Sequence, residues 1–195
     1  MHSSDFEPAR IIVLNGASSS GKTSLAKAMQ QQSDAPLHHV QLDAFRAMEP
    51  PGYWDGWEQR DEIDRQAMMS ALCGAMFAAV LQYSRHGQQT ILDVALTNPQ
   101  ARRLLVDHLQ GWPAYLVGVH CSPAELDRRE LQRGDRKIGL AASQLDWLHA
   151  RMLYDVEIDT IGKPPEDLAI ELLAQLRDCP TPTALGRLAA LQSAA

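Results

Sequence analysis

Near its N-terminus the chain carries a run of small and hydroxylated residues that ends in a lysine and a threonine. The run, Gly16-Ala17-Ser18-Ser19-Ser20-Gly21-Lys22-Thr23, satisfies the Walker A pattern G-x-x-x-x-G-K-[ST]. Its glycines let the backbone turn inward, so that N–H groups up to that of Ser24 point at phosphate oxygens. Lys22 would reach the β- and γ-phosphates, and the hydroxyl of Thr23 would coordinate Mg²⁺. The run predicts a nucleoside triphosphate site.

The residues around this loop make the prediction more specific. The apolar run at residues 11–14 is typical of a buried parallel strand, and residues 22–32 are expected to form a helix. A phosphate loop requires a strand before it and a helix after it. The alternative is a Gly/Ser-rich turn that contains Lys-Thr by chance, which does not account for this context.

Two aspartates lie where predicted strands end. Asp43 follows the strand expected at 37–42, on the sheet edge that also holds the phosphate loop. There it could take the proton of an acceptor hydroxyl, or it could simply cap a short helix at 44–48. Asp93, in the strand expected at 90–94, resembles a short Walker B motif and is a candidate Mg²⁺ ligand. The alternative for Asp93 is a turn or capping residue.

An arginine-rich segment, residues 128–137, concentrates positive charge in an otherwise acidic chain. It ends a helix that is expected to start at the same sheet edge. Small kinases carry arginines on a lid that closes over the transferring phosphate, and Arg133 and Arg136 are the first candidates, in a lid at about 133–142. The alternative is that these arginines only complement the helix dipole and are otherwise solvated.

Aromatic residues follow Pro50-Pro51-Gly52. Tyr53, Trp54 and Trp57 could stack against an acceptor, or could pack the loop against the body of the protein. An acceptor pocket bounded by Asp43, Tyr53 and Trp54 is the resulting hypothesis.

The remaining pattern is a regular alternation of strands and helices. Further strands are expected at 115–120 and 156–159, and further helices at 58–85, 100–110, 123–134, 143–153 and 165–177. The apolar positions assigned to the core face of the 58–85 helix include Ile63, Leu72, Met76 and Val80. A β-then-α order throughout indicates a parallel sheet covered on both faces, in a single α/β three-layer sandwich at residues 1–195. The tail at 180–195 is either a loosely docked helix or frayed.

Composition excludes several classes of protein. A net charge of -6 disfavours nucleic-acid binding, which needs many lysines and arginines. There is no run of about 18 apolar residues that would span a membrane. The polar start of the chain does not resemble a secretory signal, so a cytoplasmic location is expected. The sequence carries no signal for the oligomeric state.

Several blocks of the chain also resemble a known family. They are the segment 14–23, Asp43, Ile91-Leu92-Asp93-Val94, Gly118-Val119-His120-Cys121, Arg133-Gly134-Asp135-Arg136 and the segment 154–160, in that order. With this order and spacing the chain resembles chloramphenicol phosphotransferase. The resemblance implies a P-loop kinase fold with a five-stranded parallel sheet, ATP and Mg²⁺ as cofactors, and transfer of phosphate to a hydroxyl of a small molecule, with antibiotic resistance as the result. It makes Asp43 the general base, with Arg133 and Arg136 in the lid.

The resemblance is poorest at residues 46–65, where an acceptor is expected to bind. The resemblance makes chloramphenicol the candidate acceptor. Because of the departure at 46–65, a kinase for another metabolite, such as a sugar, a shikimate-like acid or a nucleoside, is the alternative. A nucleotide-switch regulatory protein is a further alternative. Against it, the chain has no Asn-Lys-x-Asp motif for guanine, and Asp43 would have no role.

Overall fold

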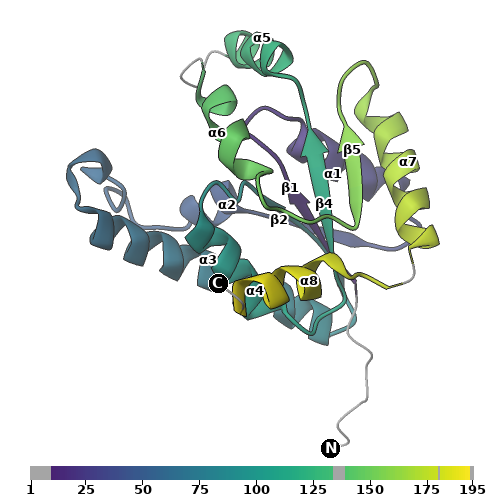
Figure 1. The fold of residues 1–195 in the computed structure, drawn as a ribbon, viewed down its shortest axis with the longest axis horizontal. Coiled ribbons are helices and arrows are strands. Elements are labelled where there is room, and N and C mark those ends of the chain that lie inside the picture. The colour runs from purple at the N-terminus through teal and green to yellow at the C-terminus, as the bar shows by residue number, and fades with distance from the viewer. Residues whose placement is uncertain (1–9, 134–138, 180, 194–195) are drawn as a thin grey trace, which may run out of the picture.

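The computed structural model describes residues 10–133, 139–179 and 181–193. Strands and helices alternate along the chain (Figure 1). The strands are β1 (Ile11–Asn15), β2 (Leu37–Gln41), β3 (Gln89–Val94), β4 (Ala114–His120) and β5 (Val156–Asp159). The helices are α1 (Lys22–Gln32), α2 (Leu42–Arg46), η1 (Trp57–Gln59), α3 (Glu62–Arg85), α4 (Pro99–Leu109), α5 (Pro123–Arg133), α6 (Leu140–Leu148), α7 (Pro165–Asp178) and α8 (Ala184–Ser193).

The five strands form one parallel sheet in the order β2-β3-β1-β4-β5. The central strand, β1, pairs with β3 and β4, so that Asn15 lies opposite both Val94 and Gly118. The carboxyl ends of all strands therefore meet at one edge, where open α/β sheets bind ligands. The predicted five-stranded parallel sheet is confirmed.

Alternate residues of β1 serve the two faces of the sheet. Ile11 and Val13 pack into a core with residues of α3, α4 and α8, whereas Ile12 and Leu14 pack into a second core with residues of α1 and α7. This alternation follows from the two-residue period of a strand and makes a three-layer sandwich. Figure 1 shows α7 on one side of the sheet and α3, α4 and α8 on the other.

A smaller cluster lies above the carboxyl edge of the sheet. Ala17 of the phosphate loop packs there with Leu126 of α5 and with Ala141 and Leu148 of α6. In Figure 1 these two helices stand over the ends of the strands. Helices α5 and α6 therefore cover the sheet edge that holds the phosphate loop.

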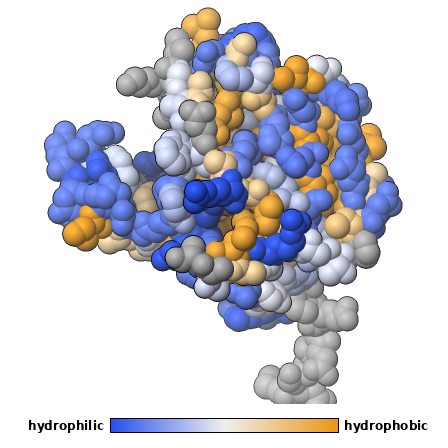
Figure 2. Space-filling model, viewed as in Figure 1, coloured by the Kyte–Doolittle hydropathy of each residue, from blue (hydrophilic) through white to orange (hydrophobic). Residues whose placement is uncertain are grey.

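Helix α3 is the longest helix, and its N-terminal end stands out from the body together with η1 (Figures 1 and 2). Most residues between 51 and 66 are exposed. By length and composition α3 would suffice for a membrane span, and its residues Leu72, Met76 and Val80 are buried in the first core. Ile63, assigned from sequence to the same face, is 78% exposed.

Several helix boundaries differ from the sequence-based prediction for local reasons. Helix α3 begins at Glu62 rather than residue 58 because the Asp61 side chain accepts a hydrogen bond from Asp64 N and caps it there. Helix α6 begins at residue 140, three residues earlier than predicted, and ends at Leu148 rather than 153. Helix α8, in the tail, packs Leu185 and Leu188 into the first core.

Candidate active site

The phosphate loop connects β1 directly to α1. A Cβ at Gly16 would lie 2.6 Å from Val119 O, and Gly21 has φ +97°, so both positions require glycine. The ammonium of Lys22 donates to Ala17 O at 2.7 Å, and the residue is only 8% exposed. The lysine is thus folded over its own loop, where an anion seated on the loop N–H groups would contact it.

Asp93 lies beside the first turn of α1. The Thr23 hydroxyl donates to its Oδ2 at 2.7 Å, and His39 Nε2 of the neighbouring strand β2 lies 3.4 Å from the same oxygen. Burial raises the pKa of the Asp93 carboxyl, but its contact with His39, the charge of Lys22 and the Thr23 hydroxyl together outweigh burial and lower the pKa. Asp93 is therefore a carboxylate, within strand β3 rather than a turn or cap.

Thr23 and Asp93 are oxygen donors of the kind that Mg²⁺ prefers. Among the described residues there is no group of three or more His, Cys, Asp and Glu side chains that could hold a metal ion. A threonine hydroxyl and one carboxylate fit Mg²⁺, because this ion keeps several waters and takes further oxygens from substrate phosphates. The structure brings together the two residues predicted as metal ligands.

Arg129 of α5 braces the phosphate loop and was missed by sequence reasoning. Its guanidinium donates to Ser19 O at 3.3 Å, and to Thr160 Oγ1 and O at 3.1 and 3.0 Å. Arg129 Nε also donates to Glu125 Oε1 at 2.8 Å. Hydrogen bonds from Arg128 and Arg129 lower the pKa of the Glu125 carboxyl to about 2. The loop after β5 is thereby tied to the phosphate loop.

A cavity of about 410 Å³ opens beside this brace. It is lined by the start of α1, by Arg129 and Gln132 of α5, and by Thr160, Lys163 and Pro165 after β5. The cavity thus lies on the α5 and β5 side of the phosphate loop. Its size and cationic groups suit the part of a nucleotide that extends from the phosphates.

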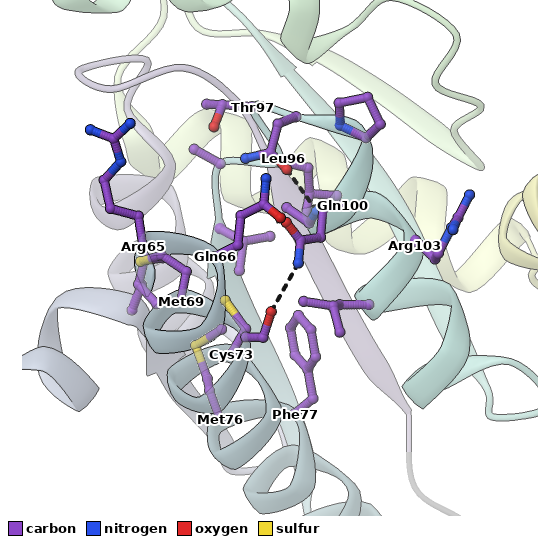
Figure 3. A pocket seen from close by; sticks show the side chains of 18 of the residues that line it. Arg65, Gln66, Met69, Cys73, Met76, Phe77, Leu96, Thr97, Gln100 and Arg103 are labelled. Atoms are coloured by element: carbon purple, nitrogen blue, oxygen red, sulfur yellow. Dashed lines mark hydrogen bonds between the residues drawn. The ribbon is translucent and has the colours of Figure 1, made fainter. Parts of the chain in front are cut away.

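A larger cavity of about 790 Å³ lies on the other side, between α3, α4 and the end of β3 (Figure 3). Its apolar lining comes from the side chains of Met69, Cys73, Met76, Phe77, Val94, Leu96 and Leu104. Figure 3 shows Gln66 and Gln100 pointing toward each other across it, and Gln100 Nε2 donates to Ser70 Oγ at 3.1 Å. Val94 follows Asp93 directly, so the cavity begins where the phosphate site ends.

The acceptor pocket bounded by Asp43, Tyr53 and Trp54 stays a prediction. In the part of the chain that the structure describes, none of these three residues lines the large cavity, although Leu42 and Trp57 do. Tyr53 and Trp54 contact each other edge to face, and Arg46 lies over the Trp54 ring at 4.6 Å. Two of the three aromatic side chains therefore pack the loop, and Trp57 alone of the three reaches the cavity.

Asp43 is an exposed residue in the first turn of α2. The N-cap position of this helix is Gln41, so the interpretation of Asp43 as a cap is wrong. Its neighbour Leu42 lines the large cavity, which puts Asp43 next to the cavity wall.

The two lid arginines are not tested by the structure. Arg133 is the last residue of α5, and Arg136 lies outside the described residues. Their role over the transferring phosphate stays a prediction.

A chain of hydrogen bonds connects the root of the phosphate loop to the turn after α6. Asn15 Nδ2 donates to the Tyr154 hydroxyl at 2.7 Å, which lies 2.7 Å from His149 Nδ1. Asn15 Oδ1 accepts from Leu96 N at 2.9 Å, at the large cavity. Burial, together with the nearby charge of His120, lowers the pKa of His149 to about 4, so this ring is neutral at pH 7. Asn15 thus links the phosphate loop, the lining of the large cavity and α6.

With this geometry in place, comparison with known proteins decides the family. Residues 9–177 match the family described as chloramphenicol phosphotransferase-like protein. A Mycobacterium tuberculosis protein named "putative O-phosphotransferase" is 34% identical over 199 residues, covering 92% of this chain and 87% of that protein. The chain belongs to the chloramphenicol phosphotransferase-like family. The family description and the name of the relative both give a phosphotransferase, and the phosphate loop, Asp93 and two flanking cavities of this chain agree with a small-molecule kinase.

Solved structures show the same fold. A Deinococcus radiodurans tunicamycin resistance protein aligns with a TM-score of 0.65 at 19% identity, covering 86% of this chain and 95% of its own. The Mycobacterium tuberculosis APS kinase, solved with AMPPNP and APS, aligns with a TM-score of 0.62 at 13% identity, covering 88% and 99%. The predicted P-loop kinase fold of this chloramphenicol phosphotransferase-like chain is confirmed.

Proposed function

We propose that this chain transfers the terminal phosphate of ATP, with Mg²⁺, to a hydroxyl of an uncharged and partly apolar small molecule, and that chloramphenicol is the candidate acceptor. The observation that carries the proposal is the position of the phosphate loop between two separate cavities. The α5 and β5 side would take the nucleotide, and the α3 and α4 side would take the acceptor. A direct transfer needs both substrates at one loop from opposite sides.

The roles follow from position. Lys22 and the loop N–H groups from Gly16 to Ser24 would hold the phosphates, while Thr23 and Asp93 would hold Mg²⁺. When bound, Mg²⁺ neutralises charge on the phosphates. Asp43, next to the acceptor cavity, would take the proton of the hydroxyl. Arg133 and Arg136 would add positive charge over the group in transfer.

The lining of the large cavity favours an acceptor without net charge. Much of its lining is apolar, and its polar residues Gln66, Ser70 and Gln100 are neutral. Its charged lining residues carry two charges of each sign, Glu62 and Asp107 against Arg65 and Arg103, and Glu62 and Arg65 pair with each other at 2.9 Å. A carboxylate or phosphate against the apolar part of this lining would lose hydration, whereas an aromatic or aliphatic alcohol would lose little.

The test is phosphate transfer from labelled ATP to a panel of alcohols that includes chloramphenicol, a sugar, shikimate and a nucleoside. We expect Mg²⁺-dependent labelling of chloramphenicol. Labelling of a different alcohol instead would support the phosphotransferase activity but exclude chloramphenicol as the acceptor. Slow ATP hydrolysis with no labelled acceptor would overturn the phosphotransferase proposal in favour of a nucleotide switch.

A further inference from the structure

The side chain of Gln144, on α6, reaches the phosphate loop. Its Oε1 accepts a hydrogen bond from the backbone N–H of Ser18 at 2.9 Å, across 126 positions of sequence. The N–H groups of a phosphate loop are the groups that hold phosphate oxygens. The N–H of Ser18 is therefore bonded to a neutral side chain of α6, which lies over the phosphate loop.

This bond fixes the orientation of the carboxamide. Because the N–H of Ser18 is a donor, the oxygen end of Gln144 faces it, and the Nε2 group is the other end. Among the described residues Nε2 has no hydrogen-bond partner. A half-buried NH₂ group beside a phosphate loop is a ready donor to an anionic oxygen.

Helix α6 is held firmly enough to keep Gln144 in place. The fully buried carboxylate of Glu130 accepts from Gly139 N and Ala141 N, both at 2.8 Å, and so fixes the first turn of α6. At the other end, Leu148 O accepts from Asn15 Nδ2 at 3.4 Å. The helix is tied to α5 and to the root of the phosphate loop, which preorganises the carboxamide.

The contact lies at the boundary between the two cavities. Ser19, the next residue of the loop, lines the smaller cavity. Ala95, which lines the larger cavity, and Leu145, which follows Gln144, both pack against the cluster that includes Ala17 and Leu148. The contact between Gln144 and Ser18 is thus close to residues that line each cavity.

We propose that Gln144 is a further catalytic residue, which keeps Oε1 on Ser18 and donates from Nε2 to the terminal phosphate of the bound nucleotide. The proposal rests on the phosphotransferase function proposed above. In the transfer, the bond from the terminal phosphorus to the oxygen shared with ADP breaks, and a bond to the acceptor oxygen forms. The acceptor proton passes to the base, for which Asp43 is the candidate, and Gln144 stabilises the oxygens of the group in transit.

Gln144→Glu is the decisive variant, because a carboxylate still accepts from Ser18 N–H but cannot donate and repels a phosphate. The measurement is calorimetric binding of AMPPNP and of ADP to the full chain with Mg²⁺. We expect AMPPNP to bind about 10- to 100-fold more weakly, the loss typical of a hydrogen bond to a charged group, with ADP affinity unchanged. Gln144→Met, of similar size, should weaken AMPPNP selectively by about 10-fold.

Trp147→Ala is the matched control, since this side chain lies on the same helix and is 64% exposed. It should leave both affinities unchanged. If Gln144 only braces the loop, Gln144→Glu will weaken AMPPNP no more than ADP, and Gln144→Met will weaken both nucleotides alike. That result would overturn the catalytic role of Gln144 but not the proposed phosphotransferase function. An unaltered chain that binds neither nucleotide overturns the proposed function as well.

Discussion

The hydroxyl of Thr23 and Oδ2 of Asp93 lie 2.7 Å apart, although the two residues are 70 positions apart in the chain. They meet because β3 pairs with β1, which puts Asp93 opposite Leu14, two residues before the phosphate loop begins at Gly16. Sheet pairing therefore delivers a carboxylate to the start of α1, where phosphates and their metal ion would lie.

Asp93→Asn should reduce turnover about 100-fold or more, because the amide has no charge with which to attract Mg²⁺. The measurement is initial rate against Mg²⁺ concentration, in which the variant should need more Mg²⁺ for its residual activity. Asp34→Asn, at an exposed position outside the site, is the control and should match the unaltered chain. An unchanged Mg²⁺ dependence in Asp93→Asn would remove Asp93 from the metal site.

Asp43→Asn should reduce turnover by about 100-fold, the size expected for loss of a general base. Binding of AMPPNP should be unchanged, since Asp43 is outside the described lining of the nucleotide cavity. Steady-state rates and calorimetry on the same preparation separate these effects. Full turnover in the variant would show that another group takes the proton.

Arg129→Ala should weaken ADP binding about 10-fold, because the loop after β5 loses its tie to Ser19 and a positive charge leaves the cavity. Arg128→Ala is the control, since Arg128 is 54% exposed and pairs with Glu125. Equal affinities for the two variants in calorimetry would mean that the Arg129 brace does not shape the nucleotide cavity.

Met69→Glu should raise the KM for the acceptor about 10-fold while leaving the KM for ATP unchanged. Met69 lines the large cavity, and a carboxylate there removes apolar contact of about 1.5 to 3 kcal/mol. Ile63→Glu is the matched control on the same helix, at a position that is 78% exposed. A rise in the ATP KM alone would place the acceptor elsewhere.

Stability should fall as pH drops from about 6.5 to about 4, because His149 has a folded-state pKa of about 4. In that interval the unfolded chain binds a proton on this ring and the folded chain does not, so stability rises with pH. The contribution of this one group is about 3 kcal/mol at most.

Chemical unfolding of the unaltered chain and of His149→Gln at several pH values measures this contribution. The variant should show a shallower dependence on pH across the same interval. His86→Gln, at an exposed position, should keep the full slope. Equal slopes for the unaltered chain and His149→Gln would show that the ring is already protonated in the fold.

Features that depend on neighbouring residues were predicted well. The predicted starts of α4 and α5, residues 100 and 123, agree with the structure to within one residue. The side chains of Asn98 and Ser122 lie at these starts and accept hydrogen bonds of 2.8 and 3.3 Å from the N–H three residues on. The phosphate loop is also local, because its groups come from consecutive residues. Local sequence specifies such elements because their partners lie within one turn.

Features that depend on distant partners were not predicted. The start of α6 is set by Glu130, nine residues before Gly139, and the loop contacts of Arg129 and Gln144 span 110 and 126 positions. The cavity face of α3 was missed because Gln66, Ser70 and Cys73 do not stand out from the apolar pattern of a core helix. Their role depends on α4, which packs beside them.

Among the residues that the structure describes, none lines both cavities. A compound that fills the smaller cavity would contact the phosphate loop, which is a motif common to many nucleotide-binding enzymes. A compound that fills the larger cavity would instead contact α3 and α4, and also Trp57, Glu62 and Arg65 of the segment 46–65, where the resemblance to the family is poorest. Selective inhibitors of this chain should therefore be sought on the α3 and α4 side, and acceptor range can evolve there without altering nucleotide binding.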